Sequence, residues 1–197
     1  MSLVSSKHAG DNILTLGQSS RVSTRNTEHR DTEAPRNPLK IQIDPAVEAD
    51  VPLILNFIKA LAEYERLAHE VVATEATIRD SLFGKEPHAE AAIARCADEA
   101  AGFAVWFSTY STFLSRPGIY LEDLFVLPAW RGKGIGRALL QHLARLAAHR
   151  GCGRLEWSVL DWNEEAIRFY RAIGARPMNE WTVYRLTGDA INRLANP

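Results

Sequence analysis

The chain has 197 residues, and its 23 Lys and Arg against 24 Asp and Glu leave a net charge of −1 at pH 7. That length fits one domain with an extension, and the near-neutral balance gives no sign of a nucleic-acid-binding surface. No apolar run approaches the roughly 20 residues that a membrane-spanning helix needs. Only two cysteines occur, without a secretory signal, which favours reduced thiols and a cytoplasmic protein. The histidines show no metal-ligand spacing, so no metal site is expected.

Residues 1–38 differ from the rest of the chain in composition. They are rich in Ser, Thr, Arg and Asn and contain few large apolar residues. Such a stretch buries too little surface to offset its ordering entropy, so we predict a disordered N-terminal extension. A transit peptide is the functional alternative, but Asp11, Glu28, Asp31 and Glu33 speak against an acid-poor presequence. The predicted folded domain is therefore residues 39–197.

Regular patterns begin at Leu39 and alternate between strand-like and helix-like periodicity. In chain order they predict a strand at Leu39–Ile43, a helix capped by Asp50 and running to about Glu65, a helix from Thr74 to Leu82, a hairpin of Ala89–Cys96 with Gly102–Thr109, a central strand at Ile119–Leu127, a helix ending near His149, a strand at Leu155–Leu160, a helix at Asn163–Ile173 and a last strand at Trp181–Leu186. This order indicates an α+β fold, in which helices flank a mostly antiparallel sheet.

A basic, glycine-rich turn separates the central strand from the long helix. It reads Arg131, Gly132, Lys133, Gly134, Ile135 and Gly136. Free N–H groups at a helix N-terminus bind phosphate, and glycines let the backbone approach the anion closely. Neither the P-loop pattern nor the dinucleotide G-x-G-x-x-G fingerprint fits these residues. The remaining interpretations are a pyrophosphate-binding loop of another kind and a β–α turn without a ligand.

The loop resembles R/Q-x-x-G-x-G/A, the acetyl-CoA motif of the GNAT-type N-acetyltransferases. The resemblance extends over about Ile41 to Leu186 and is strongest to the diamine (spermidine/spermine) and thialysine branch. The other segments that carry it are Ala62–Glu65, Tyr120–Val126, Trp162–Glu164, Phe169-Tyr170 and Gly174-Ala175. It implies a GNAT-like twisted sheet whose splayed central strands hold acetyl-CoA.

The same resemblance implies roles for individual residues. Backbone groups of Phe125 and Val126 would bond the pantetheine amides, and Arg131–Gly136 would hold the pyrophosphate. Asn163 would help to hold the cofactor. Tyr170 would also contact it and act as the general acid for the leaving thiolate; a phenol with a pKa of about 10 is protonated at pH 7. The alternative for Tyr170 is an ordinary core aromatic beside Phe169.

The amine must lose a proton before it attacks the thioester, since an alkylamine with a pKa of about 10.4 is only about 0.1% neutral, or less, at pH 7. Glu122 and Asp123 are adjacent on a strand and are expected on opposite faces. The resemblance assigns Glu122 to proton removal and Asp123 to amine binding, with Tyr64 and Glu65 as further substrate contacts. The alternative for either carboxylate is a structural ion pair with an arginine. The segment Thr109–Phe113 lacks the carboxylate of the polyamine enzymes, which favours a shorter amine.

The leading hypothesis is an acetyl-CoA-dependent N-acetyltransferase of a small primary amine (a diamine, a polyamine or a lysine-like amino acid). Two alternatives stay open: a protein lysine or N-terminal acetyltransferase, because a fold does not set its acceptor, and a non-catalytic acyl-CoA-binding module. The resemblance also implies a homodimer, for which the last predicted strand offers an edge.

Overall fold

The computed structural model describes residues 39–196, and the predicted extension at residues 1–38 lies outside them. The chain divides after Ser158 into two compact units. The first unit contains a five-stranded sheet with three α-helices, and the second, from Val159 on, contains two α-helices. No helix within residues 39–196 has the length and apolar character that crossing a bilayer requires.

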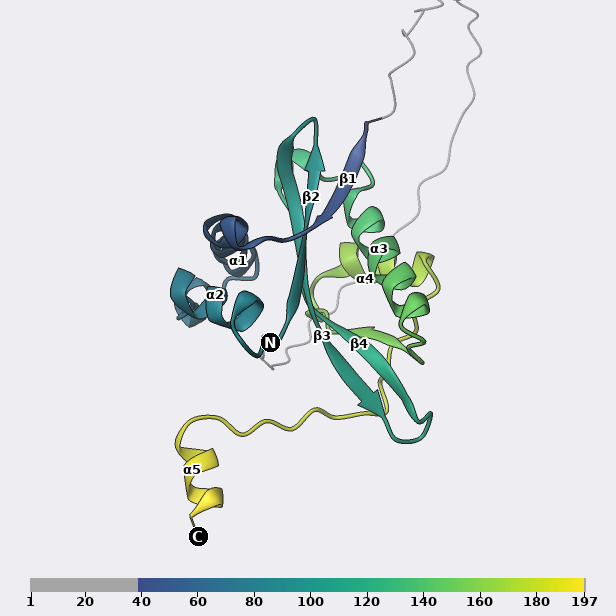
Figure 1. The fold of residues 1–197 in the computed structure, drawn as a ribbon. Helices are drawn as coiled ribbons and strands as arrows, with labels where there is room; N and C mark the ends of the chain where they lie inside the picture. Colours follow the sequence, from purple (N-terminus) through teal and green to yellow (C-terminus); the bar gives the residue numbers. More distant parts are fainter. Residues whose placement is uncertain (1–38, 197) are drawn as a thin grey trace, which may run out of the picture. The chain divides into compact units, whose positions relative to one another are not determined.

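The sheet has the strand order β1-β2-β3-β4-β5 (Figure 1). Its strands are β1 (Ile41–Pro45), β2 (Glu90–Cys96), β3 (Glu99–Ser111), β4 (Arg116–Val126) and β5 (Leu155–Trp157). The first four strands pair antiparallel and β5 runs parallel to β4. The prediction of an α+β fold with a mostly antiparallel sheet is confirmed.

Helices α1 (Val51–Tyr64) and α2 (Glu75–Phe83) lie on one face of the sheet, and α3 (Ile135–His149) lies on the other (Figure 1). The α1 face holds a core in which the rings of Phe57 and Phe103 stack with centroids 5.1 Å apart. On the opposite face, Leu139 and Leu143 of α3 are fully buried. Helices thus cover both faces of the sheet, in which β4 lies between β3 and β5.

The predicted caps of α1 and α2 have different outcomes. Thr74 caps α2 as expected, since its Oγ1 accepts a bond from the Thr77 N–H at 3.2 Å. Asp50 precedes α1 but makes no side-chain cap. Its carboxylate instead accepts from the Val47 N–H at 2.9 Å and from Arg95 at 2.9 Å. Asp50 therefore ties the entry turn to β2, because a long-range partner offers it a charged donor.

A β-bulge interrupts β4 at Glu122. Val105 pairs with Asp123 and Trp106 pairs with Leu121, so Glu122 has no opposite residue in β3. Asp123 and Phe125 consequently face α1, whereas Leu121 pairs with a residue of the α3 side, Trp106, whose ring contacts His142. The expectation that Glu122 and Asp123 point to opposite faces assumed unbroken alternation, and the bulge removes that basis.

The predicted last strand is wrong in this structure. Residues 181–186 form no strand, and four of their large apolar side chains are exposed: Trp181, Val183, Tyr184 and Leu186. The sequence has the β-branched and aromatic composition of a strand, but composition alone supplies no partner edge. The second unit instead consists of α4 (Glu164–Ala172), this extended segment and α5 (Asp189–Ala195).

Candidate active site

The glycine-rich loop leads directly into the N-terminus of α3. Gly132 and Gly134 have φ values of 72° and 86°, a region that L-residues with side chains adopt only under strain. Gly134 precedes the first helical residue, and no side chain caps the helix. A Cβ on Gly132 would meet no atom within 4 Å, so the space over the loop is open. An uncapped helix start beneath open space fits a pyrophosphate.

The two cations of the loop fix its shape. The Arg131 Nε donates to the Val126 carbonyl at 3.1 Å, and its guanidinium lies 4.4 Å from the centroid of the Tyr64 ring. Lys133 donates to the Ala129 carbonyl at 3.0 Å. Arg131 thus joins the loop to both β4 and the end of α1. The structure places Tyr64 beneath Arg131, where its ring supports the loop rather than lining the pocket described below.

The strand that precedes the loop is only partly paired on its β5 side. β5 pairs with residues 119–121 of β4, and the Tyr120 hydroxyl continues this contact to the Ser158 Oγ at 2.6 Å. From Glu122 to Val126, no strand among residues 39–158 pairs with this side of β4. An extended amide chain such as pantetheine fits beside such an edge, because backbone donors and acceptors there need partners.

In the same stretch of β4, the Asp123 side chain lies on the face of the sheet that α1 covers. Burial, together with the nearby charges of Glu122 and Glu65, raises the pKa of Asp123 from 3.8 to about 6. Among residues 39–196, no cationic side chain forms an ion pair with this carboxylate. Burial also raises the pKa of Glu65, which follows the last residue of α1. The charges of the three carboxylates act on one another, and together they form a negative region at this end of the sheet.

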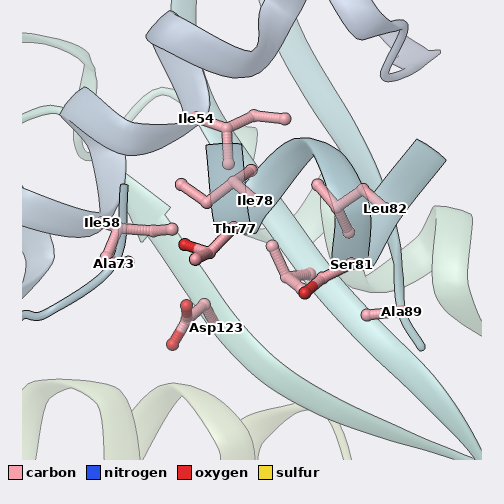
Figure 2. A pocket seen from close by; sticks show the side chains of 10 residues that line it. Ile54, Ile58, Ala73, Thr77, Ile78, Ser81, Leu82, Ala89 and Asp123 are labelled. Carbon is pink, nitrogen blue, oxygen red and sulfur yellow. The ribbon is translucent and has the colours of Figure 1, made fainter. Parts of the chain in front are cut away.

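A pocket of about 210 Å³ opens beside Asp123 (Figure 2). Its wall is mostly aliphatic and comes from α1, α2 and β3: Ile54, Ile58, Ile78, Leu82 and Val105. The polar side chains that line it are Asp123 on the strand side and Thr77 and Ser81 on the helix side. A mostly apolar cavity with few polar groups is the usual form of a small-molecule site.

Comparison with known proteins identifies the family. The sequence profile of the Acetyltransferase (GNAT) family matches residues 57–175, more than half of the chain. The chain belongs to the GNAT acetyltransferases. It is therefore an N-acetyltransferase, and the family implies acetyl-CoA as donor. The glycine loop and the open β4 edge described above fit that donor.

Individual relatives cover most of the GNAT chain. It is 36% identical to a thialysine N-epsilon-acetyltransferase of Bos taurus, over 79% of this chain and 97% of the relative. It is 32% identical to an L-ornithine N5-acetyltransferase of Arabidopsis thaliana, over 76% of this chain and 85% of the relative. Among solved structures, an integron cassette protein of V. cholerae has a TM-score of 0.67 at 30% identity, covering 80% and 98% of the two chains. The resemblance to this branch is confirmed.

Two of the predicted GNAT site residues lie in the second unit, which is described by itself. The Asn163 Oδ1 accepts a bond from the Ala166 N–H at 3.2 Å and so caps α4. Tyr170 lies on the same helix, with its ring centroid 5.5 Å from that of Phe169. Their predicted roles toward acetyl-CoA and the leaving thiolate remain predictions.

The contribution of α2 was missed by the sequence reasoning. Thr77 and Ser81 are four residues apart and share one helical face, and together with Ile78 and Leu82 they line the pocket. The four-residue spacing is visible in the sequence, but it does not show which residue of the sheet lies opposite.

The segment around Ser111 lies far from the pocket. Ser111 follows Val105 by six residues in β3, which corresponds to about 20 Å along the strand. The segment Thr109–Phe113 therefore does not line the pocket beside Asp123.

Proposed function

We propose that this N-acetyltransferase moves an acetyl group directly from acetyl-CoA to a small primary amine: a diamine, a polyamine or a lysine-like amino acid. The proposal rests on Asp123, whose partly buried carboxylate lines a pocket. No described cation pairs with this carboxylate. A carboxylate removed from water is costly unless a cation joins it. A protonated amine supplies that cation. The relatives named for thialysine and ornithine, which are both amino acids with a side-chain amine, support this class of acceptor.

The two carboxylates of β4 have different roles toward the acceptor. Asp123 binds the ammonium group, and Glu122 accepts the proton that the nitrogen must lose, directly or through water. Glu65 adds a negative charge close to Asp123. The bulge supports this division, because it brings two consecutive carboxylates to one interruption of the ladder instead of separating them by strict alternation. The nitrogen then attacks the thioester carbonyl, and the carbon–sulfur bond breaks.

The donor is held by the loop and by the strand before it. The backbone N–H groups of Gly132 to Gly136 take the pyrophosphate, with Lys133 and the helix dipole of α3 adding positive potential. Arg131 serves through its backbone and by fixing the loop, since its side chain is engaged with Val126 and Tyr64. Phe125 and Val126 offer backbone groups to pantetheine. By the family resemblance, Asn163 helps to hold the donor, and Tyr170 protonates the leaving thiolate.

A thiol-release assay with acetyl-CoA tests the acceptor. The panel contains putrescine, ornithine, thialysine, spermine and a lysine-containing peptide. We expect kcat/KM for the small amines to exceed that for the peptide by tenfold or more. If kcat/KM for the peptide is instead tenfold or more above that for the small amines, the protein is a protein acetyltransferase. Asp123→Asn should raise KM for the amine far more than KM for acetyl-CoA.

We further propose a homodimer in the cytoplasm. The dimer rests on the resemblance and on the exposed apolar segment 181–186, which offers strand-forming residues to a partner. The compartment rests on the two cysteines, both of which are free thiols in the structure. Light scattering at micromolar concentration tests the dimer, and a monomer mass would contradict it.

A further inference from the structure

Among the residues that the structure describes, Asp123 is the one charged side chain that lines the pocket. From the strand side to α2, the wall consists of aliphatic groups, two alanines and the hydroxyls of Thr77 and Ser81. A second ammonium group placed against this wall would lose its hydration without meeting a carboxylate there. The charge lies at one end of the cavity and an uncharged space at the other.

The volume sets the size of what enters. A cavity of about 150 Å³ lined by aliphatic side chains is large enough to hold benzene. The pocket here measures about 210 Å³, so an uncharged body of about six carbon atoms fits. The aliphatic wall of α1 and α2 would remove such a body from water, which stabilises it in proportion to the apolar area buried.

We infer that the site takes primary amines with an uncharged apolar body of about six carbons, the ammonium group lying at Asp123 and the body in the pocket. This acceptor class goes beyond diamines, polyamines and lysine-like amino acids. It rests on the proposed function, because it uses the same acetyl transfer to an amine nitrogen. The nitrogen forms the new bond to the acetyl carbon, and the thiolate of CoA leaves and takes a proton.

Two matched amines test the inference. Hexylamine and 1,6-diaminohexane have the same chain and differ in the second ammonium group. In the thiol-release assay with acetyl-CoA, we expect hexylamine to have a kcat/KM at least tenfold above that of the diamine. Along the series from propylamine to hexylamine, kcat/KM should rise by about fourfold per methylene, the factor that corresponds to burying one CH₂. A flat series, or a diamine at least as good as hexylamine, overturns the inference.

A pair of variants at Ser81 checks that the body lies in this pocket. Ser81→Asp places a charge on the helix side of the pocket, and Ser81→Asn has nearly the same shape without the charge. We expect Ser81→Asp to shift the preference at least tenfold toward 1,6-diaminohexane, relative to Ser81→Asn. Unchanged acetyl-CoA binding in both variants shows that they are folded. Equal preferences in the two folded variants would place the body elsewhere.

The remaining outcomes separate the inference from the proposed function. If putrescine and thialysine are acetylated but hexylamine is not, the inference fails while the proposed function stands. If no amine in either panel releases thiol, the proposed function fails with it. A donor preference for hexanoyl-CoA over acetyl-CoA, lost in Ser81→Asp, would assign the pocket to the acyl chain and overturn the inference.

Discussion

Replacing Asp123 by asparagine should make the protein more stable at pH 7. Burial raises the pKa of this carboxyl from 3.8 to about 6 in the folded state. At about 1.36 kcal/mol for each pH unit between the two pKa values, the ionised carboxylate costs the folded state about 3 kcal/mol at pH 7. Asparagine has nearly the same shape and no charge, so Asp123→Asn should recover most of that free energy of unfolding.

The stabilisation that Asp123→Asn gives should depend on pH. Between about pH 4 and pH 6, the folded protein holds a proton on Asp123 that the unfolded chain has released. The contribution of Asp123 to the free energy of unfolding therefore falls as the pH rises through this window and is constant above it. Below pH 4 both states are protonated, and the variant should gain nothing. The gain should appear between pH 4 and pH 6.

Urea unfolding of both proteins at pH 4 and pH 7 measures the difference. Asp98→Asn is the matched control, because Asp98 is exposed in the β2–β3 turn. Asparagine accepts its φ of 65°, and this variant should differ from the wild type by no more than about 0.5 kcal/mol at either pH. An Asp123→Asn variant with no gain at pH 7, or with an equal gain at pH 4, would show that Asp123 already has a compensating partner.

Three other predictions concern the donor, the acid and the N-terminal residues. At acetyl-CoA concentrations of about 100 times Kd, the wild type should gain about 2.7 kcal/mol in thermal or urea unfolding. Gly134→Asp should lose this gain by repelling the pyrophosphate, while Gly134→Asn, with the same backbone strain, should keep much more of it; identical behaviour would place the pyrophosphate elsewhere. Tyr170→Phe should lower kcat by about 10²–10⁴-fold with little change in acetyl-CoA affinity, and an unchanged single-turnover rate would leave Tyr170 a packing residue. Deletion of residues 1–38 should preserve both the unfolding midpoint and kcat/KM, and a large drop in either would show that these residues contribute to the domain.

Local patterns were sufficient for most elements of the first unit. The apolar spacing of Leu139 and Leu143 and the glycines before Ile135 depend on nearest neighbours along the chain, and the structure has α3 where they predict it. β3 extends to Ser111, two residues beyond its predicted end at Thr109, because its pairing with β4 continues there. Pairing is a long-range property, and strand ends follow it.

The candidate site depended more strongly on contacts that no local pattern contains. The loop was predictable because glycine and a helix start are adjacent in sequence. The partners of Arg131 were not, since Tyr64 lies 67 residues away in the chain. The pocket joins β4 to α2 across the core, and only the fold shows that Thr77 and Ser81 lie opposite Asp123.

The bulge at Glu122 divides β4 into two halves with opposite side-chain parity. Ile119 and Leu121 before it are buried, as is Phe125 after it, yet these apolar residues serve different faces of the sheet only because one residue is skipped in the pairing. Deleting Glu122 would therefore restore plain alternation, because Leu121 and Asp123 would become neighbours and keep their partners Trp106 and Val105 on opposite faces of the sheet. Both faces of β4 would stay as they are, and the strand would lose only one carboxylate and the local bend of the bulge. The extra residue at this position is not required by the pairing of the sheet.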